Sequence, residues 1–283
     1  MTSQTHQILD SGIGRLEDSP LLNMVIPQED ADQLYLVYPN LAKNHNIGCP
    51  ACGKNAGQNT DGYVMLQNGW WQCNCRDQLQ RHKHYLNAGI GSTYQYLDWN
   101  NYVGSQDALA FVLNYVRNLD DNVDAGIGFS LTSEHYGTGK SMLASLVLKE
   151  CVKRGYICFS TTYADMLASM KSGWHDPIFA KWYKQKVDSA QVLMIDDIGK
   201  ELSDEGSFNT GMSQVTLDSI LRTRSQQNRP TFFTSNYGAA DIGSAYGGAV
   251  LSLMKEQGEM VSVHGEDYRE KFVRPMRGFR RVY

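Results

Sequence analysis

Residues 133–141 read SEHYGTGKS, and this stretch decides how the rest of the chain is interpreted. Its second half, GTGKS, matches the end of the phosphate-binding loop pattern G-x-x-x-x-G-K-[ST]. The first glycine of that pattern is replaced here by Glu134. That position begins the loop and does not cradle the β-phosphate, so we expect nucleotide binding to survive, weakened to some degree by a carboxylate near phosphate. The residues expected to bind the nucleotide are Gly137, Thr138, Gly139, Lys140, Ser141 and, from a later strand, Asp196.

The second half of the loop keeps the groups that phosphate chemistry needs. A phosphate requires converging backbone N–H donors, a helix N-terminus behind them and a cation against its charge. Gly137 and Gly139 allow the backbone to curl closely around the phosphate, and Lys140 supplies the cation. The hydroxyl of Ser141 can enter the coordination shell of Mg²⁺. A strand is expected before the loop and a helix after it, and this context favours a true phosphate site.

Beyond residue 120, apolar runs of strand length alternate with longer runs of helical periodicity. Strands are expected at 126–132, 156–162, 191–199, 230–236 and 260–265. Helices are expected at 141–155, 164–173 and 215–228, and an amphipathic helix is expected to start earlier, at Asp107. Alternation of this kind specifies an α/β fold with a parallel sheet, whose ligands bind at the carboxyl ends of the strands.

Polar residues stand at the ends of two of these strands. Asp196 and Asp197 end the apolar run of 191–199, and Asn236 ends the run of 230–236. We expect Asp196 to hold Mg²⁺, directly or through water, and Asp197 to polarise the attacking water, a role more often given to glutamate. Asn236 is expected to orient that water or to sense the γ-phosphate. The loop, the acidic pair and the polar strand end together predict an ATPase domain.

Four of the six cysteines lie close together in the first third of the chain, as the pairs Cys49 with Cys52 and Cys73 with Cys75. Two pairs of thiolates around a short excursion are typical of a structural zinc site with four sulfur ligands. The second pair is C-x-C, where C-x-x-C is commoner. The alternative is four free or disulfide-bonded cysteines, although disulfides are disfavoured in a reducing cytoplasm. Outside this group, Cys151 and Cys158 are expected to be small buried hydrophobes.

The motifs YGTGKS, VLMIDDIG and RPTFFTSN resemble those of the DnaC/DnaI group of AAA+ ATPases, the loaders of the replicative helicase. The last motif also resembles the related IstB-type transposition ATPases. The resemblance covers about residues 47–269. It implies a P-loop AAA+ domain with five parallel strands in the order 5-1-4-3-2 and ATP bound at interfaces between subunits. It also implies an N-terminal region that grips a hexameric helicase and an ATPase domain that binds single-stranded DNA.

The resemblance carries over to two further sites. The group places an aromatic residue on a DNA-facing segment after the second helix, where MKSGWHD has Trp174. Stacking a base on tryptophan tolerates any sequence, which suits a loader; the alternative is that Trp174 packs internally. The group also places an arginine finger, supplied in trans, on the helix after the sensor strand. In this chain that helix corresponds to residues 247–258, which contain no arginine. The candidates for that role are Lys255, Arg222 and Arg224, or an arginine of the C-terminal tail; otherwise self-stimulated hydrolysis is weak.

The chain has 283 residues and a net charge of −4, with an acidic first 40 residues and a basic C-terminal tail. It shows no apolar run long enough to span a membrane and no secretory signal at its N-terminus, so a cytoplasmic protein is expected. We predict an acidic segment at 1–40, a zinc-binding helicase-interaction domain at 41–95, and an AAA+ domain at 96–283 that ends in the basic tail.

These features together predict an ATP-dependent loader of the replicative helicase, using ATP, Mg²⁺ and Zn²⁺, with single-stranded DNA, the helicase and other copies of the chain as partners. One alternative is an IstB-like helper that binds duplex DNA and recruits a transposase. The zinc cluster argues against it, because those helpers more often begin with a helical segment. Another alternative is a non-catalytic adaptor whose ATP site is only a structural switch, and the weak finger candidates leave it open.

Overall fold

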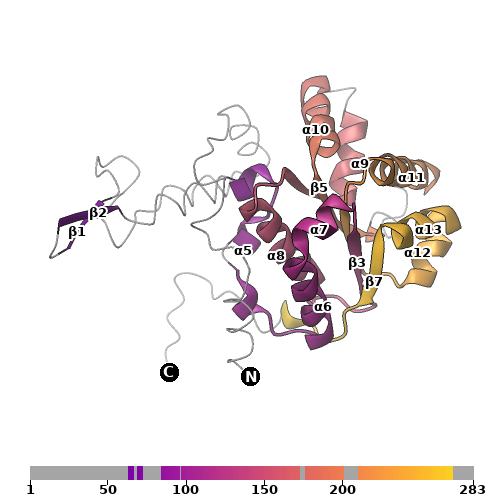
Figure 1. Ribbon diagram of the computed structural model, residues 1–283. Coiled ribbons are helices and arrows are strands. Elements are labelled where there is room, and N and C mark those ends of the chain that lie inside the picture. Colours follow the sequence, from indigo (N-terminus) through magenta and orange to yellow (C-terminus); the bar gives the residue numbers. More distant parts are fainter. Residues whose placement is uncertain are drawn as a thin grey trace, which may run out of the picture.

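The computed structural model of the chain describes residues 63–66, 69–72, 84–95, 97–172, 176–200 and 210–269 (Figure 1). Most of these residues form one α/β unit built around a central sheet. Within the described ranges, no helix is both long enough and apolar enough to cross a membrane.

The central sheet has five strands, and each neighbouring pair is parallel. The strands are β3 (Gly128–Thr132), β4 (Cys158–Thr162), β5 (Val192–Ile198), β6 (Thr231–Ser235) and β7 (Gly258–Ser262). Their order across the sheet is β4-β5-β6-β3-β7. Numbered from the first strand of this sheet and read from the opposite edge, the order is 5-1-4-3-2, which confirms the predicted fold class.

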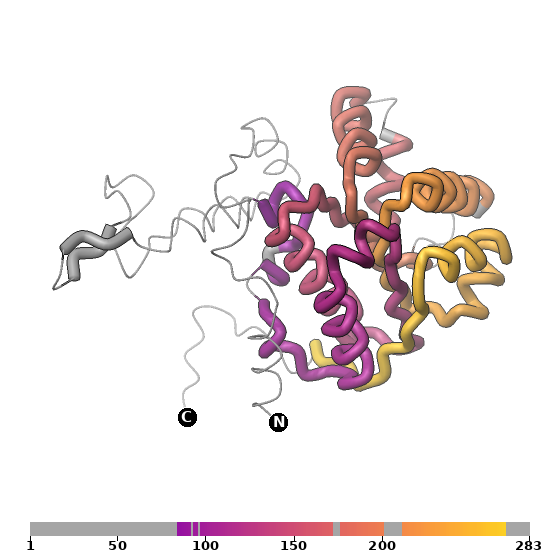
Figure 2. Tube along the Cα trace, viewed as in Figure 1, coloured from indigo at the N-terminus to yellow at the C-terminus, as the bar shows by residue number. Residues whose placement is uncertain are grey.

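The helices connect these strands and cover both faces of the sheet (Figures 1 and 2). In chain order they are α5 (Ser92–Gln95), the 3-10 turn η3 (Trp99–Asn101), α6 (Gln106–Arg117), α7 (Leu119–Asp124), α8 (Lys140–Lys153), α9 (Tyr163–Ser172), α10 (Pro177–Ser189), α11 (Thr210–Gln226), α12 (Ala239–Tyr246) and α13 (Gly248–Gln257). The helices predicted at 141–155, 164–173 and 215–228 and the helix predicted from Asp107 are present, as α8, α9, α11 and α6. The short helices α7 and α12 were not predicted, because they are too brief to show a helical period.

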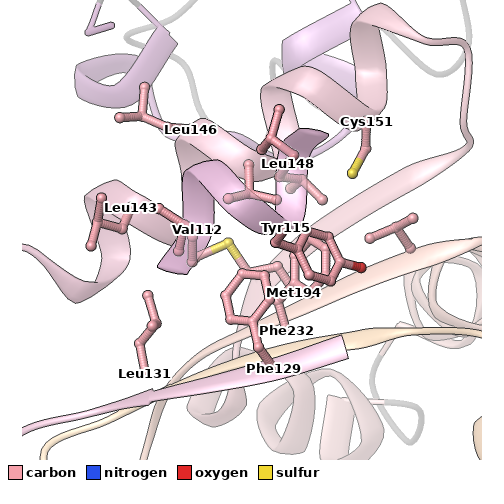
Figure 3. Packing of buried hydrophobic residues seen from close by; sticks show 14 of the residues in the cluster. Val112, Tyr115, Phe129, Leu131, Leu143, Leu146, Leu148, Cys151, Met194 and Phe232 are labelled. Carbon is pink, nitrogen blue, oxygen red and sulfur yellow. The ribbon is translucent and has the colours of Figure 1, made fainter. Parts of the chain in front are cut away.

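Alternate residues of each central strand enter different cores, as the two-residue period of a strand requires. Met194 and Phe232 join a core formed with α6, α7 and α8. Their neighbours Leu193 and Phe233 join a second core with helices α9 to α13. In the first core, the rings of Phe129 and Phe232 stack with centroids 4.3 Å apart beneath the leucines of α8 (Figure 3). The sheet is therefore buried on both faces, which holds its strand ends in fixed positions.

The chain upstream of α6 also packs on the first core. We call residues 84–95 and 97–102 the strap. Tyr85, Ala88 and Ile90 belong to the core that contains α8, and α5 lies beside that helix (Figure 1). Part of the strap precedes residue 96, the predicted start of the AAA+ domain. The domain limits as a whole stay a prediction, because most of the N-terminal segments lie outside the described residues.

The predicted zinc site and the predicted DNA-binding segment around Trp174 lie largely outside the described residues. Strands β1 (Tyr63–Leu66) and β2 (Gly69–Gln72) pair antiparallel, and in the sequence they lie between the two cysteine pairs. Cys49, Cys52, Cys73, Cys75 and Trp174 are not among the described residues, so their roles stay predictions. Cys151 and Cys158 are buried free thiols, as predicted.

Candidate functional site

The phosphate-binding loop joins the end of β3 to the start of α8. Gly137 and Gly139 both have left-handed backbone conformations, with φ of 69° and 90°. Glycine adopts this conformation without the steric cost that a Cβ adds. Gly139 is also the N-cap of α8, so the free N–H groups of the first helical turn face the loop. Glu134 begins the loop with an exposed side chain.

Lys140 lies within the loop in a position to receive phosphate. Its Nζ donates hydrogen bonds to the backbone oxygen of His135 at 2.9 Å and to Oγ1 of Thr138 at 3.3 Å. Burial lowers the pKa of Lys140 to about 8, against the opposing influence of Asp197 and Asp196. In the part of the chain that the structure describes, both acceptors of the ammonium are neutral, so an anionic phosphate would be a better partner.

Asp196 and Asp197 lie at the carboxyl end of β5, where its pairing with β6 is irregular between Ile195 and Ile198. At this point Asp197 has a φ of 59°, which is uncommon for a residue other than glycine. An irregularity of this kind turns a side chain away from its normal place in a strand. Backbone strain at such a position is a feature of functional sites.

Hydrogen bonds from β6 hold both carboxylates. Thr234 donates from its hydroxyl to Asp196 and accepts from the backbone N–H of Asp197 at 2.9 Å. Asn236 donates from Nδ2 to Oδ1 of Asp197 at 2.7 Å. Burial raises the pKa of the Asp196 carboxyl, and the nearby side chains of Thr234 and Ser141 act in the opposite direction. The structure thus gathers Ser141, Asp196, Asp197 and Asn236 at one edge of the sheet, beside Lys140.

Several residues of this site were missed at the sequence level. Thr234 hydrogen-bonds with the carboxylate of Asp196 and with the backbone N–H of Asp197, and Lys200 forms an ion pair with Asp197 at 3.6 Å. Tyr94 of the strap lies close to Ser141, and Arg269 is near enough to Lys140 to lower its pKa. Of these, only Arg269 had a signal in the sequence, as part of the basic C-terminal tail, and that signal did not point to the nucleotide.

The candidates for a trans-acting positive charge have different surroundings. Arg224 is buried and donates to Oγ1 of Thr231 and to three backbone oxygens, and burial lowers its pKa to about 9. Its guanidinium holds α11 against the sheet and cannot reach another subunit. Arg222 is exposed but pairs with Asp218 through two hydrogen bonds. Lys255 is exposed near the end of α13.

The segment after β7 returns to the loop at Gly137. The backbone N–H of Tyr268 donates to the oxygen of Gly137 at 3.1 Å, and a Cβ at Gly137 would lie 1.7 Å from Oδ1 of Asp267. A side chain at position 137 would therefore require the exposed side chain of Asp267 to move.

We therefore expect Gly137→Ala to lower both the stability and the affinity for ATP. The left-handed backbone alone costs about 1–2 kcal/mol of unfolding free energy, and the contact with Asp267 adds to it. In the Asp267→Ala background the steric part should disappear and the cost should fall. Gly248→Ala is the control, because a Cβ there meets nothing within 4 Å. Denaturant titration of the four variants measures this, and an equal cost in both backgrounds would contradict the contact.

No family model matches the chain. It is 24% identical over 182 residues to the replicative helicase loader DnaC of Escherichia coli (strain K12), covering 62% of this chain and 70% of that protein. It is 22% identical over 246 residues to the replicative helicase loader DnaI of Bacillus subtilis (strain 168), covering 80% of this chain and 74% of that protein. The chain is therefore similar in sequence to two replicative helicase loaders, DnaC and DnaI.

The fold agrees with this relationship. A crystal structure of the DnaC helicase loader superposes with a TM-score of 0.51 at 24% identity, covering 62% of this chain and all of that one. The five-stranded parallel sheet, with the phosphate-binding loop after its first strand, matches the fold of that loader. The predicted resemblance to DnaC/DnaI loaders and the predicted AAA+ fold are therefore confirmed.

Proposed function

We propose that the chain is an ATP-dependent loader that places a hexameric replicative helicase on single-stranded DNA. The observation that carries this proposal is the meeting of Ser141, Asp196, Asp197 and Asn236 beside the loop of Lys140. The two relatives are both named replicative helicase loaders, and they supply the link from an ATP site to a helicase. Such a protein would work in the cytoplasm of a bacterial cell or of a phage-infected host.

The side chains of this site suit Mg²⁺ and a nucleoside triphosphate. Mg²⁺ takes hydroxyl and carboxylate oxygens, and it takes its other ligands from phosphates and water. Ser141 and Asp196 are the two protein groups that would hold it, and among the described residues no group of three or more His, Cys, Asp or Glu gathers as a self-sufficient metal site. When bound there, Mg²⁺ would neutralise negative charge on the β- and γ-phosphates.

The chain's own groups then have distinct tasks. Lys140 and the N–H groups at the start of α8 bind the phosphates. Asp197 accepts a hydrogen bond from the attacking water and makes it a better nucleophile. Asn236 fixes the carboxylate of Asp197 by the bond at 2.7 Å. The product would be ADP and phosphate, and their release would reset the loader.

Efficient hydrolysis in this proposal needs a positive charge from a neighbouring subunit. Lys255 is the candidate with an exposed side chain near the end of α13. Lysine is a point charge and lacks the fork with which arginine matches a phosphate, so the chain alone would hydrolyse ATP slowly. Arg222 stays a second candidate once its pairing with Asp218 is broken.

Single-stranded DNA would bind along the helix pair α9 and α10, which lie side by side (Figure 2). Trp174 falls in the sequence between these helices and would stack on a base. Lys181 and Lys184 of α10 carry charges that can contact the phosphate backbone. Lys184 is exposed and pairs only with Asp188 among the ion pairs of the described residues.

The N-terminal region would hold zinc through Cys49, Cys52, Cys73 and Cys75 and would contact the helicase. The β1–β2 hairpin between the two cysteine pairs supports this, because a short hairpin is only marginally stable in water and a bound metal would stabilise it.

We expect Cys49→Ser to lose zinc and helicase binding while ATP binding persists. Metal analysis and pull-down of the helicase measure this, with Cys151→Ser as the control. If Cys49→Ser bound the helicase normally, the proposal that a zinc site in this region contacts the helicase would be wrong.

The experiment that tests the function is a pull-down from host extract with the intact protein, in the presence and absence of ATP. Recovery of a hexameric helicase in an ATP-dependent manner supports a loader. Recovery of a transposase, with filaments on duplex DNA, supports the IstB-like alternative instead. ATP binding without any hydrolysis, with and without DNA, would favour the non-catalytic adaptor.

A further inference from the structure

The chain turns at the carboxyl end of β5, directly after the acidic pair. Gly199 has a positive φ of 103° there, in the region of backbone conformation that favours glycine. A Cβ at this glycine would lie 2.2 Å from Cδ2 of Tyr237, the residue that follows Asn236 after β6. The turn therefore packs directly against the tyrosine ring.

Two hydrogen bonds of Ser235, the last residue of β6, hold the same turn. Its hydroxyl donates to the backbone oxygen of Ile198 at 2.7 Å and accepts from the backbone N–H of Tyr237 at 3.0 Å. Ser235 is buried, so these bonds are shielded from water, which strengthens them. The backbone that leads from β5 to Lys200 is therefore held in place beside the acidic pair and Asn236.

From this turn the side chain of Lys200 returns to the acidic pair. Its Nζ lies 3.6 Å from Oδ2 of Asp197, while Nδ2 of Asn236 donates to the other oxygen, Oδ1, at 2.7 Å. Each oxygen of this carboxylate thus has a partner from the same chain. An ammonium is in direct contact with the group that is expected to polarise the attacking water.

The ion pair is of a kind that a bound phosphate can replace. Its separation of 3.6 Å exceeds that of a close charge-assisted hydrogen bond, about 2.7–2.9 Å. The side chain of Lys200 is 69% exposed, and exposed ion pairs contribute little to stability. The ammonium can therefore leave Asp197 at low cost, and a triphosphate offers it more negative charge than a single carboxylate.

We propose that Lys200 is a catalytic residue that contacts the γ-phosphate of ATP bound to the same chain. The inference rests on the proposed ATP site and adds a positive charge in cis to the one expected from a neighbouring subunit. When ATP binds, the flexible stem of Lys200 lets the ammonium move from Oδ2 of Asp197 to an oxygen of the γ-phosphate. This movement frees Oδ2 for the attacking water.

Lys200 then supports the hydrolysis step without giving up its own proton. The water oxygen bonds to the γ-phosphorus, and the bond from this phosphorus to the bridging oxygen of ADP breaks. One proton of the water passes to Asp197, and the other stays on the released phosphate. Negative charge is spread over the three equatorial oxygens of the γ-phosphoryl group in the transition state, and the ammonium of Lys200 stabilises it. A single chain would owe its slow basal hydrolysis to this residue.

The test uses the full chain and its basal hydrolysis of ATP, measured as phosphate release at low protein concentration without DNA or helicase. Lys200→Gln removes the charge and keeps a polar side chain. We expect the rate to fall about tenfold or more, since one hydrogen bond from a charged group accounts for about 10–100-fold. Lys200→Arg should restore most of the loss, because it keeps the charge. Binding of Mg·ADP, which has no γ-phosphate, should not change in either variant.

Lys153→Gln is the matched control. Lys153 also pairs with a carboxylate three residues before it, that of Glu150 at 2.7 Å, but it lies at the opposite end of α8 from the phosphate loop. This variant should hydrolyse ATP at the natural rate. Thermal unfolding of each variant checks that it is folded.

A mixture of Lys200→Gln with Lys140→Ala separates a charge in cis from a charge in trans. The Lys140→Ala chain keeps Lys200 but is expected to bind ATP weakly, so its Lys200 can act only on ATP bound to a neighbour. A charge in cis predicts that the mixture does not recover the lost rate.

Hydrolysis by Lys200→Gln at the natural rate or faster would overturn the inference while leaving the ATP site intact. Recovery of the rate in the mixture would also overturn it, because the charge would then act in trans. So would an equal loss of Mg·ADP binding, since Lys200 would then shape the site without contacting the γ-phosphate. ATP binding without hydrolysis by the natural chain would overturn the inference and favour the non-catalytic adaptor. Failure of the natural chain to bind Mg·ATP would instead overturn the proposed function.

Discussion

Replacement of Lys140 by alanine is expected to weaken ATP binding by about 100-fold or more. Among the described residues, the hydrogen bonds of the ammonium go to the backbone oxygen of His135 and to the hydroxyl of Thr138. Bound phosphates would give it charged partners, and each hydrogen bond to a charged group contributes about 1.5–3 kcal/mol. Two such bonds account for a change of this size, because 1.4 kcal/mol corresponds to a factor of ten.

Isothermal titration with Mg·ATP measures the loss. Lys184→Ala is the matched control, because Lys184 is exposed on α10 and pairs with Asp188 on the same helix. It should bind ATP like the natural protein. If Lys140→Ala kept an affinity within a few-fold of the natural one, the loop at residues 133–141 would not be the phosphate site.

Replacement of Asp197 by asparagine is expected to lower ATP hydrolysis by about 100- to 1,000-fold while ATP binding changes little. The variant keeps the shape of the side chain, and its amide oxygen can still accept the bond from Asn236. It loses the negative charge that would draw a proton from the attacking water, and a positioned general base contributes about 10²–10⁴-fold. Binding is spared because Lys140, Ser141 and Asp196 remain.

Steady-state phosphate release, measured with single-stranded DNA and helicase present, gives the rate. Asp188→Asn is the control, since Asp188 is exposed on α10 ahead of the start of β5, whereas the acidic pair lies at the carboxyl end of that strand. Hydrolysis by Asp197→Asn at the natural rate would remove Asp197 from the mechanism and shift the catalytic role to another carboxylate.

Most of the fold could be predicted because its strands are buried on both faces. The run from Val192 to Ile195 is continuously apolar, as expected of a central parallel strand, and it is fully buried in the structure. The glycine-rich loop indicated where the first strand of the sheet ends and where the next helix begins. The strand order came from the resemblance to the loaders and not from any pattern in the residues. Short helices such as α12 left no periodic signal to detect.

The site was predicted only where a local motif marks it. Lys140, Asp196 and Asn236 stand at strand ends or in the loop, and the sheet brings such positions together. The left-handed backbone of Asp197 could not be foreseen, because it follows from an irregular pairing with β6. The attachment of the strap to α8 was missed because it depends on hydrogen bonds from Nζ of Lys149 to the backbone oxygens of Tyr94 and Gln95, and no spacing in the sequence records those bonds.

Helicase loading itself tests the central claim most directly. The helicase recovered from host extract would be mixed with circular single-stranded DNA, ATP and either the natural chain or Lys140→Ala, and the DNA-bound hexamers counted after gel filtration. We predict that the natural chain with ATP raises the number of loaded hexamers well above that of helicase alone, and that Lys140→Ala does not. Equal loading with and without the natural chain would contradict the account.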